Sequence, residues 1–168
     1  AFYEKLPDEV ISLGTINKVI KDSSLVEAPY AEDTQFKFVA VFHEREVGTA
    51  TITIPAGSTQ GTTTISATLT NKEKAAFEAG EKIHILEVHE NEDIWIYDDT
   101  IYDVDKDNTS ATYEFTNNLV PYKVKYDLAG GSIGNNTEVA PKIVDWNDAD
   151  LLPVGVPEKA GFSFTGWK

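Results

Sequence analysis

The segment TYEFTN at residues 112–117 alternates between polar and ring-bearing side chains. Successive side chains of a strand point to opposite sides of a sheet, so Tyr113 and Phe115 share one face. This period of two predicts a half-buried β-strand. Asn117 falls on the same face as the two rings, and the strand therefore directs a side-chain amide toward the predicted core.

The same kind of pattern recurs along the chain, with apolar residues at every second position or with clusters of β-branched residues. Strands are predicted at residues 15–20, 36–42, 51–54, 62–69, 83–88, 94–97 and 111–117. One short helix is expected after Thr70, because Thr70 and Glu73 have the spacing of a capping box and Gly80 supplies a stop. The predicted fold class is all-β with one short helix, arranged as a β-sandwich.

A change in residue vocabulary near Pro121 predicts a domain boundary. The predicted parts are a linker or added edge strand at residues 1–13, a β-sandwich domain at 14–120 and a smaller unit at 121–168. Within the smaller unit, the sequence predicts a strand at 122–127, a loop-rich stretch at 132–150 and a second strand at 161–167. Any secretion leader or wall anchor is expected outside these segments.

The composition excludes several kinds of partner and site. A formal net charge of −14 disfavours nucleic acid and anionic membranes, because both require a basic surface. The chain has no cysteine, which removes disulfides, thiolate metal sites and cysteine nucleophiles. No apolar run approaches the length of a membrane span, so membrane insertion is not expected.

Three polar residues fall on apolar strand faces. Lys18 lies on the isoleucine face of the predicted strand 15–20, and Glu87 lies on the isoleucine face of the predicted strand 83–88. With Asn117, these faces would carry an amine, a carboxyl and an amide into the core. Burying any one of them alone is unfavourable, whereas burying them together is tolerable when they satisfy one another.

These motifs resemble the collagen-adhesin B-type and pilin shaft domains of Gram-positive bacteria over residues 14–118. The shared features are a first strand with an inward lysine, a glutamate strand that follows a glycine, and a last strand of the form aromatic-x-aromatic-x-Asn. Members of that family are Ig-like β-sandwiches that form a spontaneous lysine–asparagine isopeptide bond. The resemblance implies a bond between Lys18 and Asn117, with Glu87 as the assisting acid.

The implied chemistry is physically coherent. Burial lowers the pKa of a lysine and raises the pKa of a glutamic acid. Neutral Lys18 would attack the side-chain carbonyl carbon of Asn117, while protonated Glu87 polarises that carbonyl and passes protons to the departing ammonia. The reaction occurs once per chain, so it is self-modification and not enzymatic turnover. By analogy with a disulfide closing a loop of this length, the bond would stabilise the fold by about 4 kcal/mol.

Simpler interpretations of the same residues stay open. Lys18 could extend to solvent at a strand end, or form an ordinary salt bridge with Glu87. Asn117 could be a turn residue after a strand. Lys21 and Asn118 are the neighbouring competitors for the bond, and only the strand alternation excludes them.

The segment after Pro121 closely resembles the Listeria–Bacteroides (internalin B-type) surface repeat. The shared features are an aromatic strand ending in Gly-Gly, a proline-containing loop and a final Gly-aromatic-x-Phe-x-Gly-Trp, here at Gly161–Trp167. Members of that family are small β-grasp-like units of bacterial surface proteins. The resemblance implies that Phe164 and Trp167 are packing residues.

Other candidate sites are weaker. The spacing of Asp103, Asp105 and Asp107 is similar to that of a calcium loop, but Asn108 stands where such a loop needs glycine, and an acidic hairpin tip is expected instead. The aromatic residues Trp95, Tyr97 and Tyr102 would suit either an exposed sugar-binding face or the buried side of a strand. The three histidines, His43, His84 and His89, lack metal-ligand spacing, so neither a metal nor a cofactor is expected.

These observations predict a non-enzymatic structural stalk or spacer in a cell-wall-attached bacterial adhesin or pilin. We expect an extracellular location at the bacterial surface, with attachment through regions outside residues 1–168. The expected partners are neighbouring domains of the same surface protein. The alternative is a ligand-binding adhesin module that recognises a host glycan or matrix protein.

Overall fold

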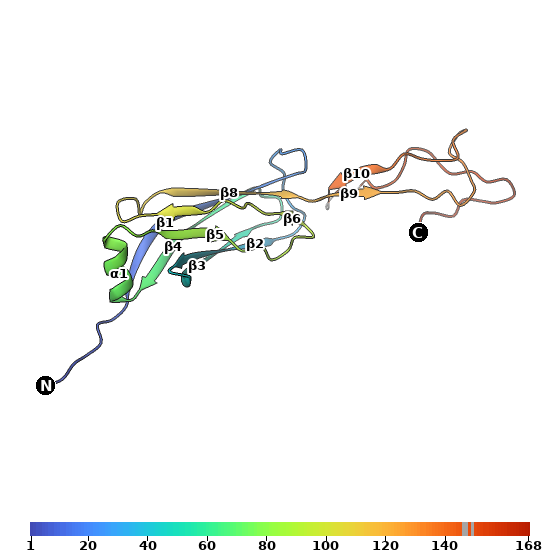
Figure 1. Ribbon diagram of the computed structural model, residues 1–168. Coiled ribbons are helices and arrows are strands. Elements are labelled where there is room, and N and C mark those ends of the chain that lie inside the picture. The colour runs from blue at the N-terminus through green and yellow to red at the C-terminus, as the bar shows by residue number, and fades with distance from the viewer. Residues whose placement is uncertain (146–147, 149) are drawn as a thin grey trace. The chain divides into compact units, whose positions relative to one another are not determined.

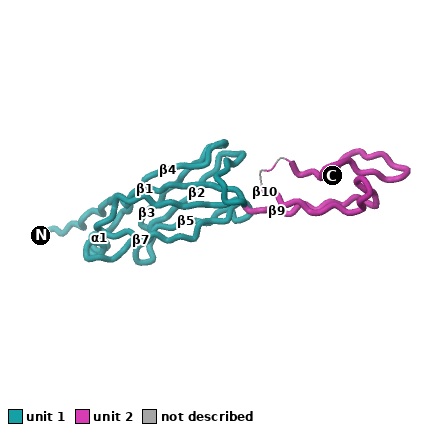
Figure 2. Tube along the Cα trace, turned by 90° about the horizontal axis from the view of Figure 1, so that it is seen from above, with its two compact units in different colours: residues 1–119 teal, residues 120–168 magenta. Residues whose placement is uncertain are grey.

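The computed structural model describes residues 1–145, 148 and 150–168. The chain forms two compact units, Ala1–Leu119 and Val120–Lys168 (Figure 2). Three residues of the predicted loop-rich stretch 132–150, namely 146, 147 and 149, lie outside the described residues.

The first unit contains two four-stranded sheets and one helix (Figure 1). Its elements are β1 (Glu9–Lys21), β2 (Thr34–Phe42), β3 (Arg45–Ile54), β4 (Gln60–Leu69), α1 (Asn71–Glu78), β5 (Ile83–Glu87), β6 (Trp95–Ile96), β7 (Tyr102–Val104) and β8 (Thr112–Leu119). The strand orders are β4-β1-β8-β6 in one sheet and β3-β2-β5-β7 in the other. The predicted all-β fold class with one short helix is confirmed.

Rings from the two sheets pack against each other in the core. The ring centroids of Phe38 from β2 and Phe115 from β8 lie 5.0 Å apart. Those of Phe36 from β2 and Trp95 from β6 lie 5.4 Å apart, in an edge-to-face arrangement. Because all four side chains are buried, the alternating apolar faces seen in the sequence meet in one core.

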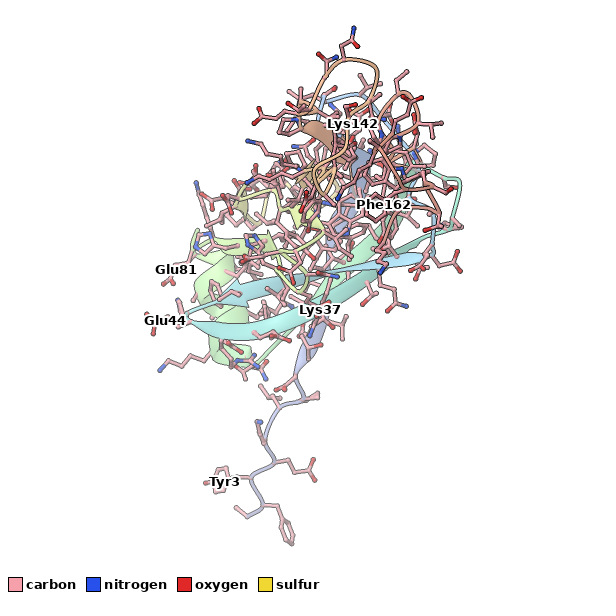
Figure 3. All side chains as sticks on the ribbon, turned by 90° about the vertical axis from the view of Figure 1, so that its right-hand side faces the viewer. Tyr3, Lys37, Glu44, Glu81, Lys142 and Phe162 are labelled. Carbon is pink, nitrogen blue, oxygen red and sulfur yellow. The ribbon has the colours of Figure 1, made fainter. Side chains whose placement is uncertain are left out.

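Strand β1 is an inner strand that touches both neighbours of its sheet. It pairs antiparallel with β4 and parallel with β8, the last strand of the unit. Residues 9–12 pair with β4 alone, so part of the segment 1–13 is strand. Residues 1–8 lie outside helices and strands, and Tyr3 is almost fully exposed on this extended segment (Figure 3).

A β-bulge in β1 determines which of its side chains face the core. The register against β4 shifts between Ser12 and Gly14. Before the bulge the odd-numbered Ile11 packs against the core, and after it the inward residues are even-numbered, including Ile16 and Lys18. Because one extra residue reverses the alternation, the bulge directs Lys18 into the core.

Helix α1 connects β4 of one sheet to β5 of the other at one end of the unit (Figure 1). The predicted capping box is present: the Glu73 N–H donates to Thr70 Oγ1 at 3.2 Å, and the Thr70 N–H donates to Glu73 Oε1 at 2.9 Å. Arg45 donates to both oxygens of Glu73 and thereby ties the helix to β3. Gly80 follows the helix with φ +109°, a conformation that ends helices.

The second unit contains an antiparallel pair, β9 (Pro121–Val124) and β10 (Lys142–Asp145). The strand predicted at residues 161–167 is wrong, since Phe162 makes only an isolated bridge with Lys159 and residues 163–167 are outside strands. Gly161 and Gly166 both have positive φ, which breaks the extended conformation that the alternating rings suggest. Strand β10 was missed because four residues carry too little periodic signal.

The bulge generates a prediction for Gly14→Ala. Gly14 has φ +119°, and a Cβ there would lie 2.3 Å from the Ala111 carbonyl oxygen. Strain and this clash should lower the free energy of unfolding by about 2 kcal/mol or more, measured by urea denaturation. Gly57→Ala is the matched control, because Gly57 also has positive φ but no atom within 4 Å of its Cβ position. Equal destabilisation by both substitutions would contradict a packing requirement at the bulge.

Candidate functional site

The structure brings the three predicted residues together in the core of the first unit. Lys18 and Asn117 have no exposed surface and Glu87 is 3% exposed, and they are the buried polar or charged residues of the described chain. Lys18 comes from β1 and Asn117 from β8, which are neighbours in one sheet. Glu87 comes from β5 in the opposite sheet, so it reaches the other two across the core.

The Glu87 carboxylate bridges the amine and the amide. Lys18 Nζ lies 2.9 Å from each of the two Glu87 oxygens. Asn117 Nδ2 donates to Glu87 Oε1 at 2.8 Å. One carboxylate oxygen therefore contacts both the nitrogen that would attack and the nitrogen that would leave.

A backbone donor holds the other end of the Asn117 amide. The Asp98 N–H donates to Asn117 Oδ1 at 2.9 Å. A backbone N–H only donates, so this contact identifies the Asn117 oxygen and leaves the amide nitrogen facing Glu87. The expectation that Glu87 polarises the carbonyl is wrong for this geometry, because Glu87 contacts the amide nitrogen and Asp98 contacts the oxygen. Strand alternation predicts which face a side chain takes, but not which atom of an amide meets which partner.

Burial perturbs both ionisable members of the site. Desolvation lowers the pKa of Lys18 to about 8, although the Glu87 charge opposes the shift. Desolvation also raises the pKa of Glu87, against the opposing charge and hydrogen bond of Lys18. Both shifts favour an uncharged amine beside a protonated acid, which is the state that a nucleophilic lysine requires.

An aromatic wall closes the site on the lysine side. Lys18 Nζ lies 4.8 Å from the centroid of the Phe36 ring. Phe36 is 1% exposed, so its ring excludes water from the amine while offering it the electron-rich ring face. The sequence alone does not predict this contact, because Phe36 and Lys18 lie on strands of opposite sheets.

These positions exclude two of the simpler interpretations, a lysine that reaches solvent and an asparagine in a turn. Lys18 does not extend to solvent, and Asn117 lies within β8 and not in a turn. The competitors Lys21 and Asn118 are each half-buried, on the strand positions next to inward residues. The Lys18–Glu87 contact has the geometry of a salt bridge, and the same contact precedes bond formation in the covalent interpretation.

The other candidate residues do not converge on a site. Trp95 and Tyr97 are 3% and 8% exposed, so they form no outward face for a sugar. Asp103 pairs with His84, and Asp105 accepts from the Asp107 backbone N–H within a turn. Among residues 1–145, 148 and 150–168, no group of three histidine, aspartate or glutamate side chains is placed to hold a metal ion.

Trp167 contacts two other rings of the second unit. The centroids of Trp167 and Tyr126 lie 5.9 Å apart, and those of Trp167 and Phe164 lie 5.7 Å apart. Phe164 nevertheless keeps 44% of its surface exposed, which is more than the core role implied by the resemblance.

The site generates a prediction about pH in the variant Asn117→Ala, which retains Lys18 and Glu87 but offers no amide for a bond. The unfolded chain keeps the lysine proton up to the ordinary pKa of 10.5, whereas the folded chain loses it at about 8. The unfolded state therefore binds more protons between these values, and the free energy of unfolding should rise with pH across this window.

Urea denaturation at several pH values measures this rise. The double variant Lys18→Ala/Asn117→Ala is the control and should lack it. An equal rise of the free energy of unfolding in both variants would show that a group other than Lys18 titrates in this pH window.

Helix α1 is far shorter than a membrane span, and the described part of the chain offers no other helix that could cross a membrane. Comparison of the whole chain with protein-family models, with curated proteins and with solved structures found no match in any of the three.

Proposed function

We propose that the first unit is a structural stalk module in which an isopeptide bond joins Lys18 of β1 to Asn117 of β8. The observation that carries this proposal is the shared Glu87 oxygen, 2.9 Å from the Lys18 amine and 2.8 Å from the Asn117 amide nitrogen. All three side chains are buried in the apolar core, where they are tolerable only as a set that satisfies its own polar groups.

The bond-forming step is balanced by the residues present. The lone pair of neutral Lys18 Nζ forms a bond to Asn117 Cγ, and the bond from Cγ to Nδ2 breaks. Glu87 Oε1 contacts both nitrogens, so it accepts a proton from the lysine nitrogen and delivers one to the departing Nδ2. The products are a secondary amide and ammonia, and no oxidant, metal or cofactor is required.

The strand arrangement gives the bond a mechanical purpose. Strands β1 and β8 are parallel neighbours, from Thr15↔Thr112 to Lys21↔Asn118. Force that enters at the start of β1 and leaves at the end of β8 pulls parallel strands in opposite directions, which loads their hydrogen bonds in shear. A covalent link between residues 18 and 117 would carry this load in place of the hydrogen bonds.

The biological setting is part of the same proposal. The resemblances to pilin shaft domains and to surface repeats support a stalk or spacer at the extracellular surface of a bacterium, attached to the cell wall. Its partners would be neighbouring domains of the same surface protein. The burial of Trp95 and Tyr97 removes the aromatic face that the alternative, a glycan-binding module, would have used.

The bond predicts a specific mass. The purified wild-type chain should be one ammonia lighter than its sequence when measured by intact mass spectrometry. Lys18→Ala, Glu87→Gln and Asn117→Ala should each have the full mass, because each removes one participant in the step. The Lys18→Ala variant should also lose about 4 kcal/mol of stability from the missing cross-link.

Two neighbouring residues provide matched controls for this experiment. Lys21→Ala and Asn118→Ala remove the same side-chain types from half-buried positions and should retain the loss of ammonia. A wild-type chain with unmodified mass would show that no bond forms. A Lys21→Ala chain that keeps its full mass would show that Lys21, and not Lys18, forms the bond.

The stalk role predicts a mechanical result. Pulling the chain from its two ends in single-molecule force spectroscopy should leave the segment between residues 18 and 117 unextended, because the bond bypasses it. Lys18→Ala should release this segment as an additional unfolding step. Release of the segment in the wild-type protein at moderate force would contradict a load-bearing role.

A further inference from the structure

We propose that Asp98 is a positioning residue for the Lys18–Asn117 reaction: its carboxylate fixes the backbone whose N–H group contacts the Asn117 carbonyl oxygen. This proposal rests on the proposed function, because it assigns a part in the same bond-forming step. Asp98 lies just after β6, where the regular pairing of that strand with β8 ends.

Strand β6 is short, and its pairing with β8 stops just before the site. The paired residues are Trp95↔Leu119 and Ile96↔Asn118. If this register continued, Asp98 would lie opposite Thr116. At this position the Asp98 side chain takes the place of a strand–strand hydrogen bond, because its Oδ2 accepts from the Thr116 backbone N–H at 2.8 Å.

The other carboxylate oxygen holds the turn that follows. Asp98 Oδ1 accepts from the Thr100 N–H at 2.9 Å, which closes a local turn. Burial disfavours the charged form of Asp98, yet the hydrogen bonds from Thr100 and Thr116 keep its pKa below the ordinary value. The Asp98 carboxylate is therefore ionised, and each of its oxygens accepts a hydrogen bond from a backbone N–H group.

These hydrogen bonds hold Asp98 against two consecutive residues of β8, Thr116 and Asn117. Its side chain binds the Thr116 N–H, and its own backbone N–H binds Asn117 Oδ1 at 2.9 Å. Because the side chain and the backbone of Asp98 contact adjacent residues of β8, a turn of the Asp98 backbone away from Asn117 would strain the contact to Thr116. The N–H donor is thus oriented before any reaction takes place.

This orientation matters at the carbonyl under attack. When Lys18 Nζ adds to Asn117 Cγ, negative charge moves onto Oδ1, where the Asp98 N–H already donates. A donor placed in advance at a developing oxyanion stabilises the transition state more than the ground state. Glu87 contacts the nitrogen end of the same amide, so the two groups divide the work: Glu87 moves protons and the Asp98 N–H stabilises the oxyanion.

The test follows bond formation in time during cell-free synthesis of the full chain. Samples are taken after synthesis is stopped, and intact mass gives the fraction that has lost ammonia. A brief protease pulse on parallel samples gives the fraction that has folded. For Asp98→Ala we expect folding to precede bond formation, and the rate of ammonia loss to fall on the order of 10- to 100-fold.

Two further variants separate positioning from charge and from general structure. Asp99→Ala removes the same charge one residue away, from a carboxylate whose side chain is 89% exposed, and should react at the wild-type rate. Asp98→Asn removes the charge as well but retains one acceptor oxygen for two N–H donors. It should therefore react several-fold more slowly than the wild type and faster than Asp98→Ala.

The outcomes distinguish this proposal from the one on which it rests. A wild-type chain that never loses ammonia contradicts the bond itself. A wild-type chain that reacts, together with folded Asp98→Ala at the same rate, overturns the role of Asp98 alone. If Asp98→Ala does not fold, the test rests on Asp98→Asn. Ammonia loss at the wild-type rate in folded Asp98→Asn would then contradict the positioning role of Asp98.

Discussion

The buried contact between Lys18, Glu87 and Asn117 is the constraint on which the rest of the first unit depends. An amine and a carboxylate in an apolar core are tolerable only when they satisfy each other, and here one Glu87 oxygen contacts both nitrogens. That arrangement requires β1 and β8 of one sheet and β5 of the other to present these three side chains at the same place in the core. Desolvation by the same core lowers the pKa of Lys18 and raises the pKa of Glu87.

Several features of the fold serve this contact. The bulge between Ser12 and Gly14 reverses the alternation of β1, so that Lys18 points inward in place of its neighbours. The parallel pairing of β1 with β8 sets Lys18 and Asn117 in one sheet, and β5 brings Glu87 from the other. Where β6 ends, Asp98 replaces the ladder and holds the carbonyl end of the amide. Each of these features affects how the three side chains are placed relative to one another.

The sequence was sufficient for the parts of this site that follow from a period of two. Lys18, Glu87 and Asn117 could be predicted because each shares parity with apolar neighbours on its strand. Asp98 could not, since an acidic residue after a short strand is common and its contacts depend on where β6 stops pairing. In the second unit, alternating rings near Phe164 predicted a strand, but glycines with positive φ interrupt it. Strand β10 was too short to show a period.

The most direct test of the account is tandem mass spectrometry of a protease digest of the wild-type chain. The account predicts a branched peptide in which the Lys18 side chain is joined to the Asn117 side chain, with one ammonia lost at the junction. Two separate, unmodified peptides carrying Lys18 and Asn117 would contradict it. The structure would then hold a buried ion pair with an amide beside it, and the load-bearing role would have no covalent basis.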